Sequence, residues 1–192
     1  MSDPFRSERL IYRAVITPDD DAFFLTVQQD PLAFRNASGQ ILKPQNKQST
    51  VAFVKLVAEE ALLGVIIALP AAEPETTSVP IGILHLDAPS AGHSHHRRSS
   101  LGIDIIRERQ GQGYGSEAIR WALAWGFRTA ALHRIGVSCF QQNESAIRLY
   151  RRLGFQQEGV TRDYLWSDGR WWDEIQFGML ESEWKEMEGK RA

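Results

Sequence analysis

The chain has 192 residues, 43% of them hydrophobic and 24% charged, and its formal net charge at pH 7 is −2. This length and apolar share are typical of one globular domain, so we expect residues 1–192 to form a single domain. The nearly balanced charge gives no electrostatic reason to expect a nucleic acid or an anionic membrane as a partner.

Strands and helices are predicted to alternate along the first half of the chain. Thr17 is predicted to cap a helix that has Pro18 at its first position and is broken by Asp30 and Pro31. Apolar periodicity predicts a second helix, and apolar runs predict strands. The elements are a strand at 9–15, a helix from Thr17 to about Gln29, an irregular stretch at 36–44, a helix at 49–61, strands at 62–69 and 81–86, and loops at 70–80 and 88–99.

The second half continues this alternation and ends in a hairpin whose predicted turn is Asp168-Gly169. Strands interleaved with helices, with hairpins at the edges, predict a mixed α/β sheet. The elements are a strand at 101–106, a helix to about Thr129, a strand at 134–140, a helix capped by Asn143 and ended by Gly154, strands near 156–166 and 170–179, and a short helix or tail at 181–190.

A glycine-rich loop lies between the strand at 101–106 and the helix that follows, and it reads Gln110-Gly111-Gln112-Gly113-Tyr114-Gly115-Ser116. Alternate glycines leave backbone N–H groups uncovered, and the start of a helix adds unpaired N–H donors and the positive end of its dipole. These features predict a phosphate or pyrophosphate site. The loop lacks the lysine of a P-loop and the Gly-x-Gly-x-x-Gly spacing of a dinucleotide fingerprint.

Two motifs resemble the GNAT superfamily of N-acetyltransferases. The family's pyrophosphate signature, Gln/Arg-x-x-Gly-x-Gly/Ala, is matched by Gln110, Gly113 and Gly115. The second motif, Asn-x-x-Ala-x-x-x-Tyr-x-x-x-Gly-Phe, is matched by Asn143, Ala146, Tyr150, Gly154 and Phe155.

The first and last segments of the chain resemble the branch of this superfamily that contains ribosomal-protein N-terminal and polyamine acetyltransferases. The resemblance therefore covers nearly the whole chain.

The resemblance implies a central, mostly antiparallel sheet of about seven strands, splayed at the cofactor strand and flanked by helices. It implies acetyl-CoA as the co-substrate and no metal. The pyrophosphate would bind the N–H groups of the glycine loop, and the pantetheine would follow the strand edge. The implied cofactor-binding residues are Ile105, Ile106, Gln110, Gly111, Gln112, Gly113, Tyr114, Gly115, Ser116, Asn143 and Tyr150.

The implied activity is the transfer of acetyl to a primary amine, which attacks the thioester directly in a ternary complex. Tyr150 would be the general acid that protonates the departing thiolate. The backbone N–H of Ile106 would polarise the thioester carbonyl. Asp104 is a candidate base, with His85, Asp87 and a water chain as alternatives.

The acceptor implied by the resemblance is a small-molecule or peptide amine, namely a protein N-terminus, a polyamine or another amine. An alternative of the same fold is a non-catalytic acyl-CoA-binding or regulatory module, and a monomer and a homodimer are both open. Aromatic residues at the last turn would cover an amine's alkyl chain or form a dimer surface. They are Trp166, Trp171 and Trp172.

The cysteine, the histidines and the apolar runs bear on redox environment, metal binding and location. Cys139 is the only cysteine and cannot form an internal disulfide, which suits a reducing compartment. The cluster formed by His93, His95 and His96 has no standard zinc spacing, so a polar loop is expected there. The N-terminus lacks signal-peptide regions, and the longest apolar run, 61–69, is too short to span a bilayer, so a cytoplasmic protein is expected.

Overall fold

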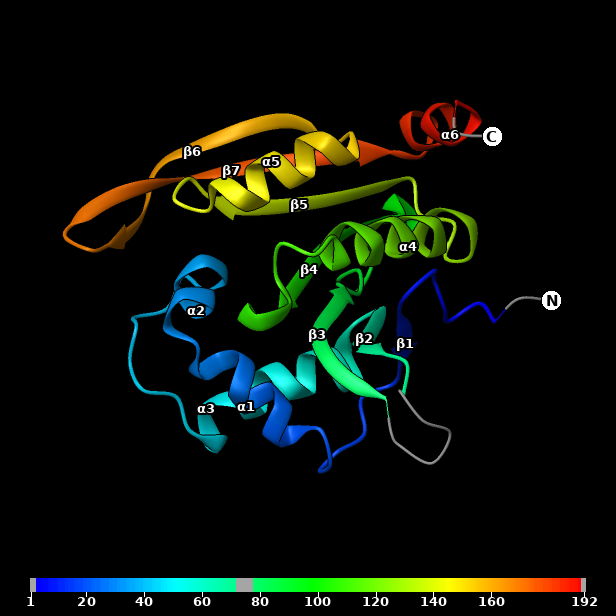
Figure 1. The fold of residues 1–192 in the computed structure, drawn as a ribbon. Helices are drawn as coiled ribbons and strands as arrows, with labels where there is room; N and C mark the ends of the chain where they lie inside the picture. Colours follow the sequence, from blue (N-terminus) through cyan, green and yellow to red (C-terminus); the bar gives the residue numbers. More distant parts are fainter. Residues whose placement is uncertain (1–2, 72–77, 191–192) are drawn as a thin grey trace.

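The computed structural model describes residues 3–71 and 78–190, and within them seven strands form one sheet in the order β1-β2-β3-β4-β5-β7-β6 (Figure 1). Neighbouring strands are antiparallel except for β4 and β5, which are parallel. The strands are β1 (Ile11–Arg13), β2 (Leu63–Leu69), β3 (Val79–Leu86), β4 (Arg98–Ile105), β5 (Arg134–Phe140), β6 (Gln156–Ser167) and β7 (Arg170–Leu180).

Helices cover both faces of this sheet, which confirms the predicted mixed α/β fold with a mostly antiparallel sheet of about seven strands. The α-helices are α1 (Asp21–Gln29), α2 (Pro31–Ala37), α3 (Lys47–Lys55), α4 (Tyr114–Arg128), α5 (Glu144–Leu153) and α6 (Glu181–Gly189). Shorter helical turns are η1 (Leu56–Glu60), which is π-helical, and the 3₁₀ turns η2 (Ser94–His96) and η3 (Arg107–Arg109).

The sheet splays between β4 and β5. These strands pair only from Arg98 to Ser100 on β4 and from Arg134 to Gly136 on β5. Beyond Ser100, β4 continues for five residues without a partner on that side. The backbone groups on this edge of β4 are therefore open to a ligand.

Two apolar clusters hold the helices to the sheet. The larger one includes Ile119 and Leu123 of α4 and Ile135 of β5, all almost fully buried. The smaller one joins Phe24 of α1 to Ile83 of β3 on the opposite face. Burying each large apolar side chain stabilises the fold by about 1.5–3 kcal/mol. The two clusters therefore hold α4 and α1 on opposite faces of the sheet.

The predicted elements of the second half agree closely with the structure. The strand predicted at 134–140 is β5. Asn143 caps α5, and Gly154 ends it with a positive φ of 94°. Asp168 and Gly169, at the turn between β6 and β7, both have positive φ angles, as the predicted hairpin turn requires.

The prediction was less accurate near the N-terminus. Thr17 does not cap a helix, because Arg13 and the N–H of Ile16 hold the Asp20 carboxylate in a turn and α1 begins only at Asp21. Asp30 does more than break a helix, since its carboxylate accepts hydrogen bonds from two backbone N–H groups and caps α2. Residues 72–77 of the predicted loop at 70–80 lie outside the described residues.

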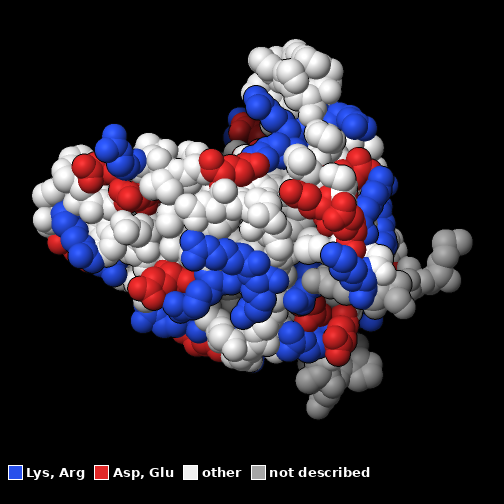
Figure 2. All heavy atoms as spheres, turned by 90° about the horizontal axis from the view of Figure 1, so that it is seen from above, with Lys and Arg blue, Asp and Glu red and all other residues white. Residues whose placement is uncertain are grey.

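Charged side chains of both signs are spread over the face seen from the side of β6, β7 and α5, and basic side chains gather near its middle (Figure 2). On this side, Arg148, Arg151 and Arg152 of α5 are exposed. Within residues 3–71 and 78–190, no helix has both the length and the apolar character to cross a bilayer.

Candidate active site

The glycine loop ends in an uncapped helix N-terminus. Gly113 stands at the N-cap of α4 with a φ of 87°, and no side chain there hydrogen-bonds the first N–H groups. Gly111 also has a positive φ, of 72°. Left-handed backbone at two positions explains why glycine is needed there. The N–H groups at the helix start and the helix dipole are the features on which the predicted phosphate site rests, and the site itself stays a prediction.

Side chains on either side of the loop hold its shape. Gln110 donates to the carbonyl of Ile105 at 2.8 Å, and Gln112 donates to the carbonyl of Glu108 at 2.9 Å. The side chains of both predicted cofactor-binding glutamines thus bind the backbone just before the loop, at the end of β4 and in η3, and leave the backbone of the loop for a ligand.

Hydrogen bonds from the N-terminal segment, which sequence reasoning missed, hold the start of α4 in place. Arg9 donates to Glu117 at 2.8 Å and to the carbonyl of Gln112 at 3.1 Å. Ser7 donates to Glu117 at 2.7 Å. Burial alone would raise the pKa of Glu117, but the hydrogen bonds from Ser7 and Arg9 outweigh it and lower that pKa. The ionised carboxylate therefore fixes the segment before β1 against the glycine loop.

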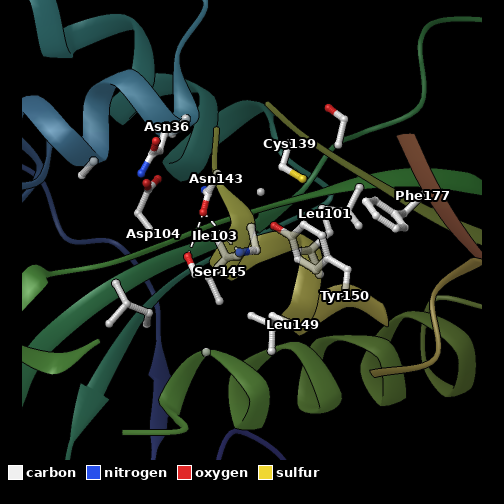
Figure 3. A pocket seen from close by; sticks show the side chains of 18 of the residues that line it. Asn36, Leu101, Ile103, Asp104, Cys139, Asn143, Ser145, Leu149, Tyr150 and Phe177 are labelled. Atoms are coloured by element: carbon white, nitrogen blue, oxygen red, sulfur yellow. Dashed lines mark hydrogen bonds between the residues drawn. The ribbon is translucent and has the colours of Figure 1, made fainter. Parts of the chain in front are cut away.

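A cleft of about 1210 Å³ occupies the splay between β4 and β5 (Figure 3). Its walls come from β4, the glycine loop, α5 and α2. It also has four arginines in its lining, Arg109, Arg134, Arg148 and Arg152, of which Arg134 is paired with Glu158. The volume exceeds that of typical small-ligand pockets, which suits a long ligand together with a second one.

The register of β3 and β4 corrects the predicted role of Ile106. Its N–H donates to the carbonyl of Ile81 at 2.9 Å, so it is not available to a thioester carbonyl. In an antiparallel ladder the bonded positions alternate, and Ile105 and Ile103 therefore direct their N–H and C=O groups away from β3, toward the splay. The hydrogen bond from Gln110 to the carbonyl of Ile105 agrees with this orientation.

Tyr150 reaches the cleft from α5 and is 6% exposed. Its ring makes edge contacts with Phe155 and Phe177 at centroid distances of 5.9 and 5.8 Å. Its hydroxyl points into the cleft, where no hydrogen-bond partner is found among the described residues (Figure 3). Burial, with a smaller contribution from the charge of Asp104, raises the pKa of Tyr150, so the phenol keeps its proton at neutral pH.

Asn143 also lines the cleft. Its carboxamide oxygen accepts hydrogen bonds from the N–H of Ala146 at 3.2 Å and the hydroxyl of Ser145 at 2.8 Å. The predicted N-cap role is therefore confirmed, and its predicted contact with the cofactor stays a prediction.

Asp104 lies on the opposite face of β4 from Ile103 and Ile105, and also lines the cleft. Burial raises its pKa to about 6. Within the described part of the chain, its carboxylate has neither a hydrogen-bond donor nor an ion-pair partner, and Figure 3 shows Asn36 of α2 pointing toward it. At neutral pH this side chain is a poorly solvated carboxylate, which favours taking up a proton.

His85 and Asp87, the alternative bases, lie on β3 and just after it, and both line the cleft. Their closest N–O distance is 3.5 Å. Burial lowers the pKa of His85, and the charge of Asp87 opposes this shift only in part. The His85 ring is therefore neutral at pH 7.

Cys139 is buried in the cleft wall, and burial raises its pKa to about 11, so it stays a thiol. The histidine cluster lies apart from the cleft, on and beside the exposed turn η2. Its closest pair of rings is His95 and His96, with centroids 3.9 Å apart. Among residues 3–71 and 78–190, no group of His, Cys, Asp and Glu side chains is suited to a metal ion.

The tryptophans of the hairpin have different environments. Trp166 and Trp171 are 58% and 54% exposed and contact each other edge to face. The guanidinium of Arg170 lies 3.5 Å from the centroid of Trp172. None of the three lines the cleft, so their predicted contact with an amine's alkyl chain stays a prediction.

Helix α2 was missed by sequence reasoning, although it closes one side of the cleft. An ion pair from Asp30 to Arg107 ties its start to η3, and one from Arg35 to Asp168 ties its end to the hairpin turn. The sequence did carry a signal for this helix, because Asp followed by Pro is a common helix start.

A family described as "Acetyltransferase (GNAT) domain" matches residues 9–156. The "Uncharacterized N-acetyltransferase YoaA" of Bacillus subtilis is 41% identical over 78 residues, which are 41% of this chain and 44% of that protein. The "[Ribosomal protein uS5]-alanine N-acetyltransferase" of Escherichia coli is 36% identical over 84 residues, or 44% and 43% of the two chains. These alignments span less than half of either relative.

The fold is shared with solved structures. Spermidine N-acetyltransferase from Vibrio cholerae, solved in complex with CoA and spermine, superposes with a TM-score of 0.77 at 21% identity. The superposition covers 93% of this chain and 99% of the other. At this identity the likeness shows the common fold.

Proposed function

The chain belongs to the GNAT acetyltransferase family, and we propose that it transfers the acetyl group of acetyl-CoA to a primary amine. One observation carries this proposal. The splay between β4 and β5 opens a single cleft that has an uncapped helix N-terminus, an unpaired strand edge, Tyr150 and Asp104 in its lining. We also propose that residues 1–192 act as one catalytic domain, since one sheet runs through both halves of the chain.

The glycine loop fits the diphosphate of CoA. Backbone N–H groups from Gln112 to Ser116 would donate to its oxygens, supported by the dipole of α4. Three of the four cleft arginines, Arg109, Arg148 and Arg152, would add positive charge, while Arg134 is paired with Glu158. In the relative solved with CoA and spermine, the same fold binds this ligand, which supports the assignment.

The outward edge of β4 fits the amide-bearing arm of CoA. Ile103 offers an N–H and a C=O toward the splay, and Ile105 offers its N–H there. We propose that the N–H of Ile105, rather than that of Ile106, donates a hydrogen bond to the thioester carbonyl and stabilises the oxyanion. The N–H of Ile106 already donates to the carbonyl of Ile81.

Tyr150 and Asp104 supply the two proton transfers. The amine nitrogen forms a bond to the thioester carbon as the carbon–sulfur bond breaks. Asp104 takes the proton that the amine loses, directly or through water, and Tyr150 donates its phenolic proton to the departing thiolate. The raised pKa makes the Asp104 carboxylate a stronger base, and the Tyr150 phenol carries its proton at neutral pH, as a donor must.

The names of two similar proteins support a broad class of acceptor. A ribosomal-protein alanine and a polyamine are the acceptors named for them, so a peptide or small-molecule amine is proposed here.

Release of free thiol from acetyl-CoA in the presence of an amine panel tests the proposal. We expect thiol release with at least one primary amine and an acetylated product of matching mass. Tight binding of CoA in calorimetry, with no thiol release for any amine or peptide N-terminus, would instead indicate the non-catalytic acyl-CoA-binding module.

A further inference from the structure

A second pocket, of about 260 Å³, adjoins the cleft. The C-terminal end of β5 and the end of α2 form walls of both spaces, because Asn36, Ser138 and Cys139 line each of them. A ligand that reacts beside Tyr150 and Asp104 can therefore extend into this second pocket.

The pocket has a carboxylate and no basic side chain in its lining. Glu174 of β7 accepts hydrogen bonds from Ser138 and Gln176, both at 3.1 Å. Within the described residues, no Lys, Arg or His forms an ion pair with it. The nearby Arg35 of α2 is paired with Asp168 of the hairpin turn. The charge of Glu174 is thus available to a ligand.

Two aromatic rings complete the pocket. The rings of Phe140 and Tyr164 lie 6.3 Å apart at an interplanar angle of 26°. Tyr164 is set there by an irregularity in β6, where the pairing with β7 shifts register between Thr161 and Leu165. Asp163 takes a left-handed φ of 50° in this bulge, and its N–H donates to Asp173 at 3.0 Å. Bulges of this kind re-aim side chains.

We propose that this pocket binds a second, positively charged group of the acceptor, an ammonium or a guanidinium, while the acceptor's primary amine is acetylated in the cleft. The inference rests on the proposed function and names its substrate class. A carboxylate beside aromatic faces is the chemistry that binds a cation, through a charge-assisted hydrogen bond and cation–π contact. Glu174 and Tyr164 are then the residues that determine specificity.

The test compares linear alkyl diamines and guanidinoalkyl amines with alkylamines of the same chain length. For the wild-type protein we expect KM to be about tenfold lower for the dicationic acceptors, as one charge-assisted hydrogen bond allows. Glu174→Gln should raise the KM of the dicationic acceptors to that of the alkylamines, and Tyr164→Leu should reduce the difference between them. Glu186→Gln, an equal charge change on exposed α6 outside both pockets, should leave both kinds of acceptor unaffected.

Binding measured by calorimetry with CoA-loaded protein separates this inference from the proposed function. If thiol is released but the two acceptor kinds have equal KM and Glu174→Gln has no selective effect, the second site is wrong while the enzyme assignment stands. If no amine releases thiol, a diamine that binds the wild type but not Glu174→Gln still supports the second site. Equal binding of diamine and monoamine would overturn it.

Discussion

Gly102 of β4 lies directly opposite His85 of β3, and the His85 ring fills the space that a side chain at Gly102 would need. A Cβ atom built on Gly102 would overlap this ring. The ring also meets Phe53 of α3 at a centroid distance of 6.1 Å, in an edge contact. Because Gly102 has no side chain, the neutral His85 imidazole fits in the cleft wall, on the same face of β4 as Asp104.

Gly102→Ala is expected to lower the free energy of unfolding by about 1–3 kcal/mol, because the overpacked ring must move. Urea unfolding measures this change. Gly189→Ala, at the end of α6 with no atom within 4 Å of the added Cβ, serves as the control and should change stability by less than about 0.5 kcal/mol. Equal stability of the two variants would mean that His85 swings aside at no cost.

Gly113→Val is expected to weaken CoA binding by about tenfold or more, since it covers the N–H groups of the anion site. Calorimetric titration with CoA measures the affinity. Gly92→Val is a matched control, because Gly92 has a similar φ of 78° in the connection between β3 and β4 and an added Cβ meets nothing within 4 Å. Both variants should lose about 1–2 kcal/mol of stability from backbone strain. A comparable loss of CoA affinity in both would contradict a specific role for the loop.

Local signals explain why much of this site was predictable. Asn143 and Gly154 mark the two ends of α5 within twelve residues of sequence, and the glycine loop marks the start of α4. Each depends on hydrogen bonds or φ angles set by its neighbours in the chain.

The remaining features depend on contacts between distant segments. The ion pair from Arg9 to Glu117 joins residues that are 108 positions apart. The exchange of Ile106 for Ile105 as the free donor follows from the register between β3 and β4, which a single strand's pattern does not contain. The pocket at Glu174 likewise requires β5, β7 and α2 to meet.

Tyr150→Phe is expected to lower kcat by about a hundredfold, the lower end of what general acid catalysis contributes, with CoA affinity unchanged. Stability should stay the same, because the phenol has no hydrogen-bond partner in the described residues and the ring contacts remain. Tyr12→Phe is the contrasting variant for stability, since Tyr12 exchanges a 2.8 Å hydrogen bond with Ser7 and should lose about 1 kcal/mol. Unchanged kcat in Tyr150→Phe would remove the acid assignment.

Asp104→Asn is expected to stabilise the fold at neutral pH. In the unfolded chain an aspartate titrates near pH 3.9, whereas burial raises the pKa of Asp104 to about 6. The folded state therefore binds the proton more strongly, and this group lowers stability as pH rises from about 4 to 6, with the full cost above 6. We expect Asp104→Asn to be more stable by roughly 1–2 kcal/mol at pH 7.5, after discounting for partial exposure, and the difference to shrink toward pH 4.

The same carboxylate should shape the pH dependence of catalysis. A base with a pKa near 6 is protonated, and so inactive, below that pH, and we expect kcat/KM of the wild type to fall on the acidic side of pH 6. In Asp104→Asn, kcat/KM should no longer fall near pH 6, and kcat should be about a hundredfold lower. The variant should also be more stable than the wild type. Because the amine's own ionisation gives a slope common to both proteins, the ratio of their kcat/KM values isolates Asp104. A ratio that stays constant from pH 5 to 8 would transfer the base role to His85, Asp87 or a water chain.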